Sequence, residues 1–298
     1  MKPSVRSPRQ SAVADVASNL LQDVHTGDRT YVVGSRQTRP NLPEAGCPFC
    51  PGGLEAPELY DVRWFQNRWP SMPDERCEVI LYTPDHDATF WSLGAAGARK
   101  VIDLWAERTA ALGARPDIDY VLVFENRGAE VGATIAHPHG QIYAFGFVPE
   151  LPLRELERGE QFDHPGDRLV ATAPGWRAWV PEAPIYPYAL KLATDPPVPD
   201  LPSLDGAGRD ALATILVDVL GALDRLFDAQ TPYMLWIHQR PFDGRDWPQA
   251  RLHIEIVTPW RAPGVPRYVA AGELGSGVYF NPVAPEAAAQ SLREALAS

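Results

Sequence analysis

A histidine-containing stretch flanked by glycines, residues 125–143, constrains this chain more than any other part of it. It reads ENRGAEVGATIAHPHGQIY, with an apolar run at 120–124 before it and another at 141–147 after it. Both runs are rich in β-branched and aromatic residues, which favours two paired strands. Gly128 and Gly132 in the connection let backbone N–H groups approach a ligand closely. The stretch therefore predicts a strand–loop–strand unit built around a binding loop.

The polar residues of this stretch alternate in a way that suits chemistry at phosphorus. His137, His139 and Gln141 are each two residues apart, and residues at this spacing share one face of a strand. An imidazole that is largely unprotonated near neutral pH is a competent nucleophile. A glutamine amide can donate an N–H to a phosphoryl oxygen. Two neighbouring histidines on a strand are also common as structural residues, so the spacing alone leaves both interpretations open.

A Cys-x-x-Cys pair at Cys47 and Cys50 indicates a metal site. Two thiolates at this spacing can bind one zinc ion, and a tetrahedral site needs two further ligands. His86, which follows an apolar run at 79–82, and His137 would complete a Cys2His2 set. A thioredoxin-like redox pair is not favoured, because no βαβ pattern surrounds the cysteines.

The charge balance excludes some partners. With 27 basic and 38 acidic residues, the net charge of −11 argues against a general nucleic-acid binder. A phosphorylated substrate would then need local arginines, and Arg36 and Arg39 lie three apart in a turn at 35–40; a solvated basic turn is the alternative. No apolar run is long enough to span a membrane, and the first twenty residues lack the apolar core of a secretory signal. We expect a cytoplasmic protein.

The pattern His-x-His-x-Gln after Glu-Asn-x-Gly-x-x-x-Gly resembles the active-site signature of galactose-1-phosphate uridylyltransferases, a branch of the histidine-triad superfamily. Hydrolases of that superfamily have a third histidine where Gln141 stands. The resemblance implies a covalent nucleotidyl intermediate on His139, with Gln141 assisting. The set Cys47, Cys50, His86 and His137 also resembles the zinc site of many uridylyltransferases.

The same resemblance implies a set of substrate-binding residues spread along the chain. The arginines would bind phosphate, Asn67 would contact the nucleoside, and Glu273 would bind the hexose hydroxyls. The full set is Arg36, Arg39, Asn67, Asn126, Gly132, Arg267 and Glu273. The chain departs from well-known members at Arg68, where they have an acidic residue, and at Tyr279, where they have a glutamine. The base and the sugar therefore stay open.

Some members of the resembled family bind a second metal through one glutamate and three histidines. Motif alignment places Glu155, His238 and His253 at three of these positions and Glu255 at the fourth. A carboxylate in place of a histidine is compatible with a second divalent ion, iron or zinc. It is equally compatible with a salt bridge in place of the ion.

The rest of the chain suggests a repeated arrangement of elements. Apolar residues recur at the helical period in 96–113 and 207–227, and a closing helix is expected at 284–296. Strand-like runs at 169–173, 176–180, 188–192, 233–238 and 251–259 repeat the outline of the first half. We expect an α+β fold of two histidine-triad-like units, residues 1–165 and 166–298, with mainly antiparallel sheet and helices packed on its outer face. The resemblance also implies a homodimer.

The expected function is exchange of a nucleoside monophosphate between a nucleotide sugar and a sugar 1-phosphate. UDP-glucose and galactose 1-phosphate are the substrates that the resemblance implies. Three alternatives remain: an ADP-glucose or dinucleoside-polyphosphate phosphorylase, a hydrolase, which Gln141 disfavours, and a zinc-stabilised nucleotide-binding protein without turnover.

Overall fold

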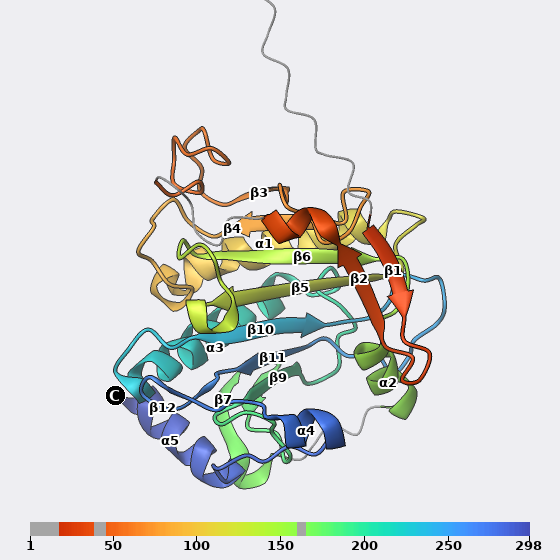
Figure 1. The fold of residues 1–298 in the computed structure, drawn as a ribbon. Helices are drawn as coiled ribbons and strands as arrows, with labels where there is room; N and C mark the ends of the chain where they lie inside the picture. Colours follow the sequence, from red (N-terminus) through yellow and green to blue (C-terminus); the bar gives the residue numbers. More distant parts are fainter. Residues whose placement is uncertain (1–17, 39–45, 160–164) are drawn as a thin grey trace, which may run out of the picture.

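One large antiparallel sheet crosses the molecule (Figure 1). The computed structural model describes residues 18–38, 46–159 and 165–298. Within them the nine strands of this sheet follow the order β3-β4-β6-β5-β10-β11-β9-β8-β7, and each neighbouring pair is antiparallel. The strands are β3 (Arg63–Gln66), β4 (Cys77–Leu81), β5 (Tyr120–Arg127), β6 (His139–Phe145), β7 (Leu169–Ala173), β8 (Trp176–Trp179), β9 (Leu190–Thr194), β10 (Tyr233–His238) and β11 (His253–Val257).

The strand order divides the sheet at the contact between β5 and β10. Strands from residues 63–145 lie on one side of this contact and strands from residues 169–257 on the other. A long helix precedes the last two strands on each side, α1 (Gly94–Gly113) before β5 and β6, and α3 (Gly206–Phe227) before β10 and β11. The predicted strand pair around the histidine loop is confirmed, because β5 and β6 are hydrogen-bonded neighbours.

Three helices cover one face of the sheet, which we call the helix face. The helices α1, α3 and α5 (Pro285–Ala297) begin and end within two residues of the predicted segments. Alternate strand residues such as Ile142, Leu235 and Ile254 point to this side and join one apolar core with the helices. Burial of that core supplies the main driving force for folding.

The opposite face of the sheet, which we call the site face, exposes His139 and Gln141. The predicted α+β fold with helices on an outer face is confirmed, and one further helix, α2 (Glu150–Arg158), lies over the site face (Figure 1). Its Glu155 contacts His238 and His253 there, and these polar contacts hold a helix that has little apolar surface.

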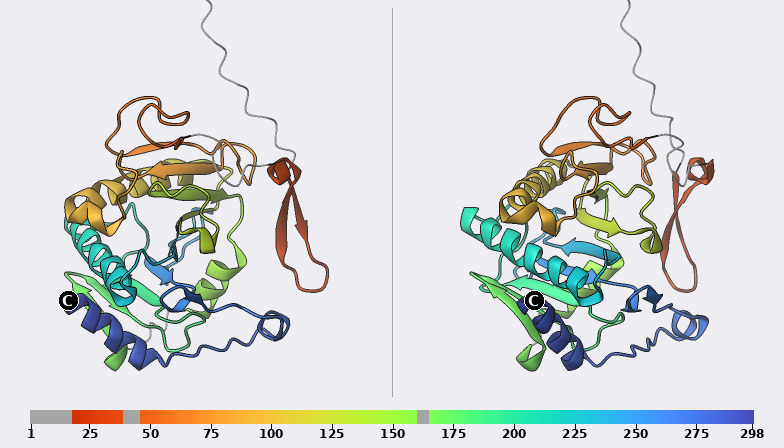
Figure 2. Two further views of the ribbon diagram at one scale, coloured as in Figure 1. Left: turned by 60° about the vertical axis from the view of Figure 1, so that its left-hand side comes forward. Right: turned by 90° about the vertical axis from the view of Figure 1, so that its left-hand side faces the viewer.

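Two extensions project from the body of the molecule (Figure 2). One is a hairpin of β1 (Ser18–Gln22) and β2 (Arg29–Val33). The other comprises the pair β12 (Trp260–Ala262) and β13 (Val265–Pro266) with the short helix α4 (Ala271–Ser276). Short 3-10 turns complete the described elements: η1 (Gly34–Thr38), η2 (Trp91–Leu93), η3 (Ala129–Val131) and η4 (Gly166–Arg168).

Large apolar side chains are exposed on both extensions. Leu21 on the hairpin is 55% exposed, and Tyr268, Leu274 and Phe280 on the second extension are 70% exposed or more. Surface of this kind commonly marks a contact with another molecule. Among the helices of the described ranges, none has the length and apolar character needed to cross a bilayer.

Candidate functional site

His139 is the first residue of β6 and lies between β4 and β5. Its Nδ1 is 2.7 Å from the carbonyl oxygen of His137, so the Nδ1–H group donates to that carbonyl. This bond selects the tautomer in which Nε2 of the neutral ring has the lone pair. The strand therefore presents the nitrogen that a nucleophile needs.

Gln141 follows on the same face, and Asn67 holds one end of its amide. The Asn67 Nδ2 group donates to the Gln141 Oε1 atom over 3.4 Å, and Asn67 Oδ1 accepts from the backbone N–H of Trp69. With the carbonyl end of Gln141 engaged, its NH2 group is the end directed to an incoming phosphoryl oxygen. The structure thus brings three of the predicted residues, His139, Gln141 and Asn67, to one place.

A cavity of about 230 Å³ adjoins His139 and is formed mainly by the loop between β5 and β6. Asn126 lines it, as do Gly128 and residues 133–138. Gly132 has a φ of +85°, a left-handed conformation that favours glycine, and its N–H donates to the Ala129 carbonyl over 3.0 Å. In this structure Gly132 therefore shapes the loop, and its amide is engaged within the turn.

The predicted zinc ligands converge in a second place next to this cavity. Cys50 Sγ lies 3.6 Å from His86 Nδ1 and 3.6 Å from His137 Nδ1, and the ligand atoms of all four residues, Cys47 included, lie within 4.8 Å of one another. Ideal zinc bonds to sulfur and nitrogen place such atoms roughly 3.5 to 3.6 Å apart around a tetrahedral ion. The spacing of these donors fits zinc.

Neighbouring groups prepare His137 to act as a ligand. Its Nε2 donates to the Thr83 carbonyl over 2.8 Å, and the Tyr60 hydroxyl is 2.9 Å from the same nitrogen, so Nδ1 is left for the metal. Burial lowers the pKa of His137 and keeps the ring neutral. Burial and the neighbouring Cys47 raise the pKa of the Cys50 thiol, a penalty that a bound cation would reverse.

His137 and His139 both line the cavity described above, but they have different contacts. His137 lies two residues before the start of β6, is fully buried and belongs to the cysteine cluster. Both imidazoles pack against the edge or face of Phe49, with ring centroids 6.2 and 5.1 Å away. The metal cluster and the nucleophile are therefore adjacent but separate.

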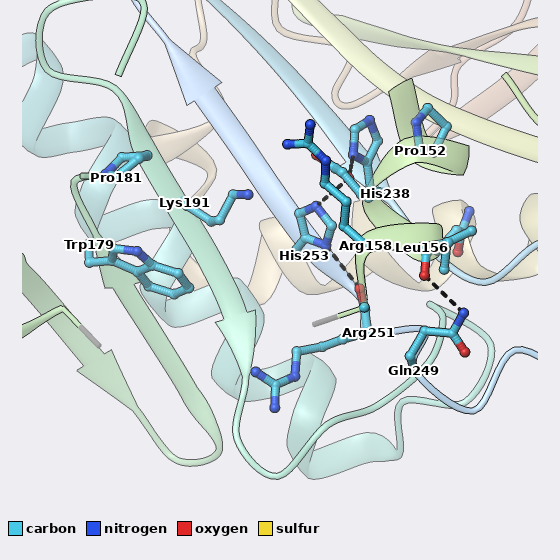
Figure 3. A pocket seen from close by; sticks show the side chains of 13 residues that line it. Pro152, Leu156, Arg158, Trp179, Pro181, Lys191, His238, Gln249, Arg251 and His253 are labelled. Carbon is cyan, nitrogen blue, oxygen red and sulfur yellow. Dashed lines mark hydrogen bonds and ion pairs between the residues drawn. The ribbon is translucent and has the colours of Figure 1, made fainter. Parts of the chain in front are cut away.

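The second predicted cluster is also assembled. It lies on the site face as well, but beyond the contact between β5 and β10, and Figure 3 shows its two histidines, His238 and His253. Glu155 Oε2 lies 2.7 Å from His238 Nδ1 and 3.3 Å from His253 Nε2, and Glu255 Oε1 is 4.0 Å from His253 Nε2. Although burial alone would raise the pKa of Glu155, hydrogen bonds from the two imidazoles lower it well below its usual range. Donor sets of this kind suit a divalent ion with oxygen and nitrogen ligands.

Lys191 is a member of this second cluster that sequence reasoning missed. It lies on β9 directly opposite Glu255 on β11, and its Nζ is 3.0 Å from Glu255 Oε1. Figure 3 shows Lys191 and Arg158 extending from opposite sides toward His253. Both line a cavity of about 480 Å³ over the cluster, together with Trp179. Only the strand register could have identified Lys191, because it is far from Glu255 in sequence.

The remaining predicted substrate residues are placed away from His139 or outside the described chain. Arg36 donates to the hydroxyl of Ser71, which is itself 2.9 Å from the Tyr143 hydroxyl on β6. Arg39 lies outside the described residues. Arg267 and Glu273, both buried, form an ion pair with each other.

The segment that contains Arg267 and Glu273 is remote from His139 within one chain. Helix α4 lies at the opposite end of the molecule from β6 in each view (Figures 1 and 2). Glu273 also accepts from the backbone N–H groups of Ala270 and Phe280, both over 2.9 Å, so the ion pair orders this extension. The prediction that these residues bind the sugar phosphate is therefore not met within a single chain.

Comparisons with known proteins identify similar sequences along most of the chain. Residues 66–149 match the family model described as galactose-1-phosphate uridyl transferase, N-terminal domain. A galactose-1-phosphate uridylyltransferase of Streptomyces lividans is 36% identical over 97% of this chain and 90% of its own length. One of Thermotoga maritima is 32% identical over 90% of this chain and 96% of its own length.

Solved structures share the fold. A uridylyltransferase structure has a TM-score of 0.83 at 26% identity and covers 93% of this chain and 98% of its own. An ADP-glucose phosphorylase of Arabidopsis thaliana has a TM-score of 0.74 at 21% identity over 93% of this chain and 98% of its own, and this likeness concerns the fold alone.

Proposed function

The chain belongs to the galactose-1-phosphate uridylyltransferase family, and we propose that it exchanges uridine monophosphate between UDP-glucose and galactose 1-phosphate. The products are glucose 1-phosphate and UDP-galactose. One observation supports this most directly: His139, whose Nδ1 is engaged by the His137 carbonyl, lines a cavity, and Gln141 follows it on the same strand face.

The reaction proceeds in two displacements. His139 Nε2 attacks the α-phosphorus of UDP-glucose, the bond to the bridging oxygen breaks, and glucose 1-phosphate leaves with that electron pair. A phosphate oxygen of galactose 1-phosphate then attacks the same phosphorus and releases His139. The His137 carbonyl stabilises the positive charge on the modified ring through Nδ1–H, and Gln141 donates to the phosphoryl oxygen.

Zinc at Cys47, Cys50, His86 and His137 is part of this proposal. Its role is to tie the segments that bear the two cysteines and His86 to His137, two residues before His139, which holds the nucleophile in place. Thiolate ligands require a reducing compartment, and we place the protein in the cytoplasm on that ground.

The second cluster is proposed as a weaker site for a divalent ion, iron or zinc. Glu155, His238, His253 and Glu255 offer the donors, but the Lys191 ammonium already neutralises Glu255. An ion bound there would face that positive charge at short range, which lowers its affinity.

A homodimer would complete the site. The second extension ends far from the His139 of its own chain and exposes Tyr268, Leu274 and Phe280. We propose that these residues contact a second copy, so that the ordered Arg267–Glu273 segment of one chain reaches the sugar phosphate bound to the other.

We also propose that residues 1–165 and 166–298 are two histidine-triad-like units joined at β5 and β10. The repeated order of helix and strands supports this division.

Labelled substrate tests the reaction class. The protein is incubated with UDP-glucose labelled at the α-phosphate, first without acceptor and then with galactose 1-phosphate or inorganic phosphate. We expect an acid-labile protein adduct that galactose 1-phosphate discharges as UDP-galactose. Discharge by inorganic phosphate alone would indicate a phosphorylase, free nucleotide a hydrolase, and no adduct a binding protein. ADP-glucose in parallel tests the base.

A further inference from the structure

Glu125 opens the Glu-Asn motif, yet the chemistry above gives it no role. It lies on β5 and is 3% exposed. Burial of a carboxyl group destabilises the folded state unless hydrogen bonds within the protein replace those that the group makes with water. Its Oε1 accepts from the Tyr233 hydroxyl over 2.7 Å, and Tyr233 lies on β10, across the contact between the two sides of the sheet.

Tyr82 is the second phenol next to Glu125. Burial raises the pKa of Glu125 to about 7, and the nearby Tyr82 phenol acts in the opposite direction; the Tyr82 hydroxyl and the Glu125 Oε2 atom are both buried and have no hydrogen-bond partner in the described part of the chain. Tyr82 follows β4 and is itself fully buried among Phe90 and Trp105. Glu125 therefore connects side chains from two strands that flank the strand pair of the active site.

The Tyr82 hydroxyl also touches the strand of the nucleophile. A Cβ atom added at Gly140 would lie 2.2 Å from the Tyr82 oxygen, so the ring reaches the backbone of β6 at this residue. Gly140 is the residue between His139 and Gln141. The position of the Tyr82 ring thus limits how the backbone that bears both active-site side chains can move toward the core.

We propose that Glu125 is a positioning residue. It holds the phenols of Tyr82 and Tyr233 in place next to Gly140, an arrangement that we call the brace, and thereby fixes the positions of His139 and Gln141 relative to the substrate cavity. The inference rests on the proposed nucleotidyl transfer and adds a residue to it. Glutamine can also accept from one phenol and donate to the other, so it preserves the brace, whereas alanine leaves both hydroxyls without this neighbour.

Single-turnover transfer of the α-phosphate label to His139 tests the brace. In Glu125→Ala we expect the transfer rate to fall by about 10- to 100-fold, because a displacement below 1 Å at the reacting atoms has effects of this size. Glu125 also borders the cavity beside His139, but it is only 3% exposed and its Oε1 accepts from Tyr233, so the dissociation constant for UDP-glucose should change by less than about threefold. Glu125→Gln should restore the rate to within about threefold of wild type.

The control is a buried carboxylate that does not touch Gly140. Glu78 on β4 is fully buried and pairs with Arg108 over 2.8 Å, so Glu78→Ala should lower the melting temperature without changing the transfer rate of the folded protein. If Glu125→Ala does not fold, Tyr233→Phe removes one hydroxyl and should lower the rate by about three- to tenfold.

Three results would overturn the brace. They are a transfer rate in folded Glu125→Ala equal to wild type, a Glu125→Gln variant as slow as the alanine variant, and an equal loss in Glu78→Ala. Wild-type protein that forms no adduct at all would instead refute the proposed function, so the two failures are distinguishable.

Discussion

His139 and His253 have the same local geometry on the two sides of the sheet, yet only one is equipped as a nucleophile. Each places its Nδ1 close to the carbonyl oxygen two residues earlier, at 2.7 and 2.9 Å. His139 also lines a cavity and is followed by Gln141 on the same strand face, whereas the Nε2 of His253 lies 3.3 Å from the Glu155 carboxylate. Strand position orients both rings, and the neighbouring side chains decide what each ring can do.

The two clusters next to these histidines differ in the same way. Sulfur and nitrogen donors in the first are spaced for a tetrahedral ion, and their other contacts are with neutral groups such as the Thr83 carbonyl. In the second, the carboxylates are already bonded to two imidazoles and to Lys191. A dication at the second cluster must therefore compete with the Lys191 ammonium group for Glu255.

The largest difference should appear when each histidine is replaced by asparagine. His139→Asn should lower nucleotide exchange by at least about 10⁴-fold, because no other group can form the covalent intermediate. His253→Asn should retain activity within about tenfold. Steady-state exchange measured on folded, zinc-loaded protein checks both, and equal losses would erase the distinction between the two sides.

Removal of one ligand from each cluster sharpens the comparison of the metals. Cys50→Ser should lose its zinc and lower the melting temperature by roughly 5–10 °C, since a few kcal/mol of binding energy contributes to folding. Glu255→Gln should leave that zinc in place. Metal content and calorimetry provide the measurement, and zinc retained in Cys50→Ser would contradict the assigned ligand set.

Two carboxyl groups, the buried Glu125 and the half-buried Glu155, should respond to pH in opposite directions. Burial raises the pKa of Glu125 to about 7, so its contribution to the free energy of unfolding falls as pH rises from about 4.5 through 7. Hydrogen bonds from the imidazoles lower the pKa of Glu155, so its contribution is present above about 4.5 and is lost at lower pH.

The matching glutamine variants isolate each contribution. Relative to Glu125→Gln, wild type should lose up to about 3 kcal/mol of unfolding free energy between pH 4.5 and 8. Glu155→Gln should be destabilised most near neutral pH. Denaturant titrations across this range make the measurement, and parallel curves for wild type and Glu125→Gln would show that the carboxyl group is not desolvated as described.

The smallest expected effect concerns Lys191. Lys191→Met should strengthen binding of a divalent ion at the second cluster by about tenfold, because it removes the competing positive charge and frees Glu255. Competition with a graded series of chelators measures this affinity, with the zinc at Cys47 and Cys50 as an internal reference. Unchanged affinity would mean that Lys191 does not compete with the ion.

The sequence by itself determined the features that depend on local spacing. Helical periodicity located α1, α3 and α5, and apolar runs located β5 and β6. The spacing of Cys47 and Cys50 indicated a metal site, and the family resemblance supported His86 and His137 as the ligands that the fold brings to it. The helices, the strands and the cysteine pair could be read because each depends on residues whose relation is set by the geometry of one helix, strand or turn.

The tertiary structure alone decided the contacts between distant strands and faces. The register that places Lys191 opposite Glu255, the position of α2 on the site face, and the contact of Tyr82 with Gly140 all join residues far apart in sequence. Pairing register and packing of this kind depend on the sum of many weak interactions across the fold, which no local pattern encodes.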